Sequence, residues 1–115
     1  MGDIMKFPRP INWKKLRSDE AEQLIRERAA RGRTGGVIFT DHAWDRVDER
    51  DITREDVFRI LREGFCQTPE KNEEGEWQVI VTKRVKGQRE AGAVTIILED
   101  DEKLIIRTVE WMDLK

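Results

Sequence analysis

The fold is decided by residues 77–111, which have the sequence WQVIVTKRVKGQREAGAVTIILEDDEKLIIRTVEW. Three runs rich in β-branched residues stand in this stretch: 77–83, 93–99 and 104–111. A loose basic link, 86–92, joins the first two runs, and a tight acidic turn, 100–102, joins the last two. Apolar runs separated by such turn signals are typical of consecutive strands. We therefore expect an antiparallel meander within a sheet of three to four strands.

The residues at the N-terminus divide into an arm and a helix. Residues 1–17 mix prolines, apolar and basic side chains, which is typical of an extended arm that packs on the body of the protein or on a partner. Ser18 is a good N-cap. Beyond it, apolar residues recur on one helix face: Ala21, Leu24, Ile25 and Ala29. We expect this helix to stop at Gly32. The predicted organisation is an arm and amphipathic helix at 1–35 and an α+β domain at 36–115, forming one compact unit.

Two further helices are expected between the first helix and the meander. A brief strand at 37–39 leads into a helix that is capped by Thr40 or Asp41 and ends near Arg50. The next helix occupies 53–64 and opens with a pattern that resembles a capping box. The predicted fold class is therefore α+β, with N-terminal helices packed on one face of a C-terminal antiparallel sheet.

Composition limits the functional classes. The 115 residues suffice for one domain, and 22 basic residues nearly balance 24 acidic ones, so any nucleic-acid site must be a local basic patch. Cys66 is the only cysteine, which excludes a disulfide framework. The first ten residues lack the apolar segment of a signal peptide, and every apolar run is too short to span a bilayer. We expect a cytoplasmic protein without a membrane partner, a bound metal or another cofactor.

One group of residues has the composition of a phosphodiester site. His42, Arg46 and Arg50 follow one another at four-residue spacing, which forms a continuous row on a helix. Arginines can hold phosphate oxygens while a histidine moves protons. The same residues also permit a structural interpretation, because carboxylates such as Asp45 and Glu49 lie close enough for ordinary surface ion pairs.

Two other basic groups are present. The first follows the first predicted strand and is the better nucleic-acid candidate, although it also resembles a charged hairpin tip: Lys83, Arg84, Lys86 and Arg89. The second alternates with acids on the first helix and is expected to be a solvated face: Arg26, Arg28, Arg31 and Arg33. Trp77 has the chemistry to stack on a base, but it also suits the core, where we place Trp44 and Trp111.

Residues 39–57, FTDHAWDRVDERDITREDV, resemble the domain-of-unknown-function family 4258. The family pattern is a short apolar lead, then His-Ala, an Arg four residues after the His, a second Arg four residues later, an Ile two further on, and a helix that starts at Ser or Thr. This chain matches each point, and the resemblance extends over roughly residues 36–111.

The resemblance implies a fold similar to RelE- and MqsR-type toxins, which are small metal-independent ribonucleases paired with antitoxins. It places His42, Arg46 and Arg50 at the catalytic positions and suggests RNA contacts by the sheet-borne residues Lys83 and Arg84. Such sites often use a tyrosine, and this chain has none, so either His42 takes that role or the domain binds without cleaving. We expect a small toxin-type endoribonuclease whose arm and first helix bind an antitoxin or another protein. The alternative is a non-catalytic protein-interaction or nucleic-acid-binding domain of a phage or mobile element.

Overall fold

The structure is a computed structural model that describes residues 11–31 and 36–112. Within these residues the helices are α1 (Ser18–Ala29), α2 (Asp41–Arg50) and α3 (Arg54–Glu63). The strands are β1 (Val37–Phe39), β2 (Phe65–Cys66), β3 (Glu70–Lys71), β4 (Trp77–Lys86), β5 (Arg89–Ile97) and β6 (Leu104–Trp111). The α+β class and the order of helices before the main strands are confirmed. The described helices are all too short or too polar to cross a membrane.

The strands form one mostly antiparallel sheet in the order β1-β6-β5-β4-β2, with β3 also paired to β4. The predicted meander is confirmed as β4, β5 and β6. The sheet is wider than the expected three to four strands, because short strands extend both edges. β1 lies parallel to β6, with Val37 opposite Leu104. The long stretch of chain between the two strands, which contains α2 and α3, provides the crossover connection that a parallel pair needs.

The link expected to be loose, 86–92, is a tight hairpin instead. β4 and β5 stay paired as far as Lys86 and Arg89, which leaves only Gly87 and Gln88 in the turn. Gly87 has a φ of +52°, a conformation that glycine adopts without steric cost and that two-residue hairpin turns require. The strands therefore carry their basic residues to the very tip of the hairpin.

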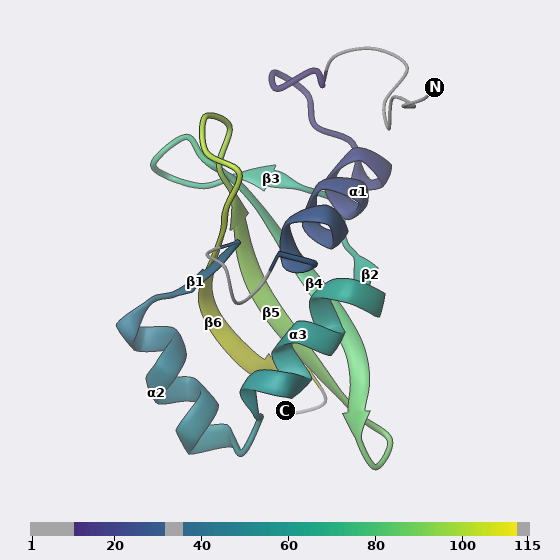
Figure 1. Ribbon diagram of the computed structural model, residues 1–115, viewed down its shortest axis with the longest axis vertical. Helices are drawn as coiled ribbons and strands as arrows, with labels where there is room; N and C mark the ends of the chain where they lie inside the picture. Colours follow the sequence, from purple (N-terminus) through teal and green to yellow (C-terminus); the bar gives the residue numbers. More distant parts are fainter. Residues whose placement is uncertain (1–10, 32–35, 113–115) are drawn as a thin grey trace.

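The helices α1 and α3 lie across one face of the sheet, and α2 runs along β6 at its edge (Figure 1). Apolar residues of all three helices join the same buried cluster as the strand residues Val81, Ala93 and Ile106. From the arm, Leu16 is buried in this cluster and Ile11 and Trp13 pack against it. Part of the apolar surface expected to bind a partner is therefore used inside the fold; residues 1–10 lie outside the described chain.

The helix starts follow the capping chemistry of the sequence in two cases of three. Thr40 caps α2, its Oγ1 accepting a hydrogen bond from the Ala43 N–H at 3.0 Å. Thr53 and Asp56 form the predicted capping box of α3, with bonds of 2.9 and 3.0 Å. The N-cap of α1 is Arg17 rather than Ser18. Between α2 and α3, Asp51 takes the left-handed conformation, with a φ of 55°, and ends α2 where a break was predicted.

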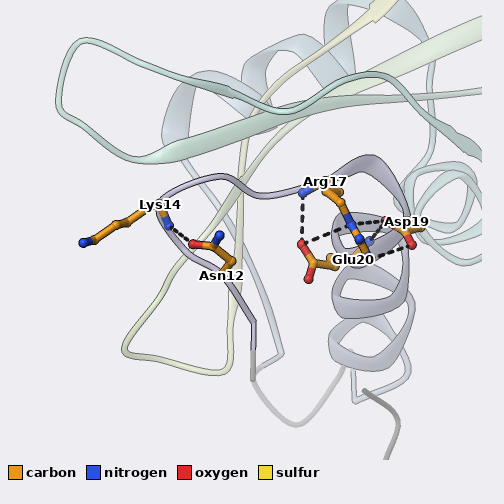
Figure 2. Close-up of polar contacts among 5 residues, drawn as sticks. All are labelled: Asn12, Lys14, Arg17, Asp19 and Glu20. Carbon is orange, nitrogen blue, oxygen red and sulfur yellow. Dashed lines mark hydrogen bonds and ion pairs between the residues drawn. The ribbon is translucent and has the colours of Figure 1, made fainter. Parts of the chain in front are cut away.

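Figure 2 shows why α1 begins one residue earlier than expected. The backbone N–H of Arg17 donates to the Glu20 carboxylate at 3.1 Å, and its guanidinium makes two 3.1 Å hydrogen bonds to Asp19. Acidic residues in the first turn therefore accept the hydrogen bonds that fix the start of the helix, in place of a serine hydroxyl. They also complement the helix dipole. Upstream, the Asn12 side chain accepts from the Lys14 N–H at 3.1 Å, which turns the arm toward the helix.

One arginine of α1 contradicts the prediction of a solvated face. Arg28 is 5% exposed, and its guanidinium donates to the carbonyl oxygens of Leu98 at 2.8 Å and Lys103 at 3.0 Å. It thereby ties α1 to both ends of the turn between β5 and β6. Burial lowers the pKa of Arg28 from its usual value. Arg26 is exposed and pairs with Glu22 at 2.5 Å, as expected of a surface residue; Arg33 lies outside the described residues.

Gly64 ends α3 for a reason other than the one predicted. A C-terminal glycine usually supplies a left-handed residue, but Gly64 has an ordinary φ of −81°. A Cβ at this position would lie 2.5 Å from the Ile60 carbonyl oxygen and 2.7 Å from that of Thr82. The glycine is required because the end of α3 passes close to β4.

Candidate functional site

The row His42, Arg46, Arg50 lies on α2 and turns gradually from solvent toward the protein. Ala43 and Val47 form the buried face of the helix and pack into the core. The side chains of the row lie next to this face and become less exposed toward the end of the helix. His42 is exposed, Arg46 is partly buried and Arg50 is partly buried. The rise of an α-helix separates His42 from Arg50 by about 12 Å along the axis. The three residues therefore cannot all hold one phosphate group, and they form two neighbouring positions.

His42 and Arg46 form the first position, at the start of α2. No hydrogen bond or ion pair within the described chain engages the His42 imidazole, so both of its ring nitrogens are open to a ligand. Arg46 lies one helical turn further on and pairs with Glu49 on the same helix. This ion pair agrees with the structural interpretation of Arg46. An anion that binds there has to compete with a surface carboxylate, which costs little because such pairs contribute about 0–1 kcal/mol.

Arg50 forms the second position, at the end of α2. Its Nε is buried and has no hydrogen-bond partner among the described residues. A buried, unpaired donor on a charged group is costly, and such groups are rare enough in proteins to require an explanation. Thr108 on β6, the strand against which α2 packs, has a buried hydroxyl oxygen that also lacks a partner in the described chain.

Trp111 connects the end of α2 to the basic hairpin. Its indole N–H donates to the Arg50 carbonyl at 2.8 Å, and the Arg89 guanidinium lies over its ring at 4.1 Å from the centroid. On the other side of the same helix end, Lys86 pairs with Asp51 at 3.6 Å. Two residues predicted to contact RNA are therefore brought next to the second motif arginine. We call Arg50, Lys86, Arg89 and Trp111 the hairpin corner.

The other predicted RNA contacts lie elsewhere. Lys83 pairs with Glu63 at the end of α3 at 3.4 Å, while its neighbour Arg84 points to the opposite side of β4. Trp77 starts β4, roughly 30 Å along the strand from Lys86. Its indole N–H donates to the Trp13 carbonyl at 2.6 Å, and the side chain packs against the core. The structure thus separates Trp77, Lys83 and Arg84 from the motif.

The surroundings of Trp77 are acidic. A cavity of about 270 Å³ there is lined by Trp77 with four carboxylate residues: Glu76, Glu99, Asp100 and Asp101. A polyanion is disfavoured next to such a set of charges. No cluster of three or more histidine, cysteine or acidic residues within the described part of the chain is arranged to hold a metal ion.

The remaining residues considered in the sequence are Trp44, Trp111 and Cys66, and they differ in burial. Trp111 is buried, as expected of a core residue, whereas Trp44 is 41% exposed. Trp44 stacks on Phe39 at 4.5 Å between ring centroids, with the Arg54 guanidinium 6.0 Å from its ring. Cys66 is buried, and burial raises the pKa of its thiol to about 11, so it is not a ready nucleophile.

A family model for a domain of unknown function, DUF4258, matches residues 39–111, and the chain belongs to that family. No curated protein and no solved structure matches the chain. The matched region includes α2, α3 and the whole meander, so it contains both positions of the α2 row and the hairpin corner.

The sequence did not indicate that Trp111 and Thr108 belong to the site. Trp111 was assigned to the core, and its burial is correct, but its polar edge also fixes the end of α2. A tryptophan in the last strand, with a donor that needs a partner when buried, was the available signal. Thr108 gave no signal, because nothing in the sequence indicates that its hydroxyl is buried without a partner on the side of the sheet that it shares with Val94.

Proposed function

We propose that this domain is a small RNA-cleaving protein of the toxin type, acting in the cytoplasm on the phosphodiester backbone along α2. The observation that carries the proposal is the row on α2, which starts with the exposed, unengaged His42 and ends with the buried, unpaired Nε of Arg50. An RNA strand laid along this helix would place one phosphate at His42 and Arg46 and the next at Arg50 in the hairpin corner.

The chemistry of the proposal is transesterification. The 2′-hydroxyl attacks the adjacent phosphorus, the bond from phosphorus to the 5′-oxygen breaks, and a 2′,3′-cyclic phosphate and a 5′-hydroxyl result. His42 acts as general acid or base, and the other proton is exchanged with water. Arg46 leaves Glu49 to neutralise the charge that develops on the phosphoryl oxygens. Arg50, in the hairpin corner, holds the neighbouring phosphate in register.

A second candidate is RNA binding without cleavage, and one observation favours it. The chain has a single histidine, His42, and no tyrosine, so a second side chain of the kinds that usually move protons in such sites is absent from its sequence. Arg46 is moreover already paired with Glu49. In this case the same surface holds the strand, and a cognate antitoxin or another protein binds through the arm and the exposed side of α1.

The test uses purified protein and a single-stranded RNA labelled at its 5′ end, incubated in EDTA. Cleavage is expected for the wild-type protein, and a loss of at least about 100-fold in rate for His42→Ala, because a positioned acid or base contributes about 10²–10⁴-fold. An RNA whose 2′-hydroxyls are methylated must bind but stay intact, since the attacking oxygen is blocked.

The controls separate binding from catalysis. His42→Ala retains its affinity for RNA if the histidine acts in chemistry, whereas Arg50→Met weakens binding. Wild-type protein that binds RNA without cutting it supports the second candidate and contradicts the first. Wild-type protein that neither binds nor cuts RNA of mixed sequence contradicts both.

A further inference from the structure

The two faces of the sheet differ in what covers them. One face packs against α1 and α3, and the neighbouring residues on each strand point the other way. Cys66 and Phe65 illustrate this alternation on β2, since Cys66 is 6% exposed and Phe65 is 70% exposed. We call the second surface the open face. Its apolar members are Ile38, Phe65, Ile80, Val94, Ile96 and Ile105, of which Ile96 is buried at 5% exposure.

The open face collects most of the exposed apolar surface of the described chain. Ile38 is 43% exposed and is paired with Ile105, and Phe65 is paired with Thr82 at the other end of the sheet. Met112 covers Gly92 on the same face, where a Cβ on the glycine would lie 2.5 Å from the Met112 sulfur. Contiguous exposed apolar patches of this kind are uncommon on monomeric proteins and mark interaction sites.

The charges around this patch are of both signs. Arg84 and Arg107 contribute positive charge, and Glu70, Glu90 and Glu110 contribute negative charge, as their strand pairings and the Arg107–Gln78 hydrogen bond of 2.9 Å place them. Three carboxylates oppose a nucleic acid on this surface. A border with charges of both signs is instead compatible with a second copy of the same surface. In a two-fold contact, a residue of one copy faces a different residue of the other, so that arginines can face glutamates.

The open face also has a projection and a hollow of its own. Phe65 projects from β2, and a hollow of about 80 Å³ lies further along the same edge of the sheet, lined by Gln67, Thr68, Glu70, Gln78 and Ile80. Because four of the five residues that line the hollow are polar and one of them is Glu70, Phe65 of a second copy would pack on the apolar members of the patch and not in the hollow.

We propose that the open face binds a second copy of this chain, forming a two-fold dimer in which the two sheets stack and Phe65 packs on the apolar members of the partner's open face. The five strands from β1 to β2 and about 20 Å of strand length cover roughly 400 Å² on each copy. The total of about 800 Å² is below the roughly 1,000 Å² expected of a stable interface, so the dimer is a weak one that dissociates in the micromolar range or above. This interface is independent of His42 and of any activity toward RNA.

Sedimentation velocity from about 1 µM to about 1 mM tests the proposal, because this range brackets the expected dissociation constant. The weight-average mass is expected to rise from 13.6 kDa toward twice that value. Phe65→Glu and Ile38→Glu, at opposite ends of the patch, each weaken association at least about tenfold, since they bury a charge in an apolar contact. Circular dichroism confirms that the variants are folded.

Trp44→Glu is the matched control, because Trp44 is the other strongly exposed apolar residue and lies on α2. It leaves the dissociation constant unchanged. Wild-type protein that stays monomeric at about 1 mM overturns the proposal. So does association that persists in Phe65→Glu, or that Trp44→Glu weakens equally. If Phe65→Glu instead weakens RNA binding by a monomeric wild type, the open face is an RNA surface and the dimer is refuted.

Discussion

Arg28 on α1 and Arg50 on α2 occupy similar places, each in or near the last turn of a helix that packs on the same core. Their guanidinium groups differ in hydrogen bonding. Arg28 is almost fully buried and donates to two carbonyl oxygens that flank the turn between β5 and β6. Arg50 is partly buried, and its Nε has no partner within the described residues.

The difference separates an arginine that stabilises the fold from one that is available for binding. A buried cation persists when hydrogen bonds replace its hydration, and Arg28 satisfies this condition. Arg50 incurs desolvation without that compensation, so its position lowers stability unless a ligand supplies acceptors. Unsatisfied groups of this kind gather at functional sites, where stability is sacrificed for binding. Mutations at the two positions should therefore affect different measurements.

The largest effect is expected for Arg28→Met. The substitution keeps most of the apolar volume and leaves the carbonyls of Leu98 and Lys103 without donors, which should cost about 3 kcal/mol of unfolding free energy. Urea unfolding measures this loss as a lower midpoint. Arg59→Met on the exposed side of α3 is the control and should change stability by less than about 0.5 kcal/mol. Equal effects at both positions would remove the basis of the comparison.

Arg50→Met should produce the reverse pattern. It removes a buried donor that has no partner, so stability should stay within about 0.5 kcal/mol of the wild-type value or rise. Affinity for single-stranded RNA should fall about tenfold, or about 1.4 kcal/mol, through the loss of a charge-assisted phosphate contact. Fluorescence anisotropy measures this loss, with Arg62→Met on α3 as the charge-matched control. A drop in stability without a change in affinity would make Arg50 structural, like Arg28.

Thr53→Ala tests how much the N-cap of α3 stabilises the junction between α2 and α3. The Thr53 hydroxyl caps α3 directly after the turn that ends α2, so its loss should cost about 1 kcal/mol. Thr53→Ser retains the hydroxyl and should recover most of the difference in urea unfolding. An unchanged midpoint for Thr53→Ala would show that the rest of α3 holds the joint without its cap.

The smallest effect concerns Cys66, which packs under α1. Burial raises the pKa of the thiol from 9.0 to about 11. The folded state therefore favours the neutral thiol, and the resulting stability is intact below pH 9 and declines as the pH rises through 11. At pH 9 the loss should be about 0.4 kcal/mol relative to Cys66→Ala, which lacks this titration. Parallel curves of stability against pH for the wild-type protein and Cys66→Ala would contradict this prediction. Folded wild-type protein should also resist alkylation at pH 8.

Local patterns in the sequence predicted most of the fold. The β-branched runs marked β4, β5 and β6, and hydroxyl residues at Thr40 and Thr53 marked the starts of α2 and α3. These features depend on neighbours within a few residues, so the chain alone contains the required information. The closed hairpin at Gly87 was missed because a glycine in a polar link permits both a loose loop and a tight turn, and only the pairing of the strands selects between them.

The sequence located the candidate site, and the geometry of a single helix already divides it into two positions. The four-residue spacing placed His42, Arg46 and Arg50 on one helix row, and the helix rise then separated the ends of that row. Which hairpin residues join the row could not be predicted, because Lys86 and Arg89 reach Asp51 and Trp111 only through long-range packing. The placement of Lys83 and Arg84 on opposite sides of β4, by contrast, follows from the local alternation of side chains along a strand.

By itself, the sequence determined that this chain is an α+β domain with a histidine–arginine helix, since helical and strand periodicity and capping are local properties. Only the tertiary structure decided which arginine is structural and which is available. Arg28 was expected in solvent and Arg50 in a site, but the type of residue is the same in both. What differs is the set of carbonyls and strands that the folded chain brings within hydrogen-bonding distance, and those contacts join residues about 70 positions apart in the sequence.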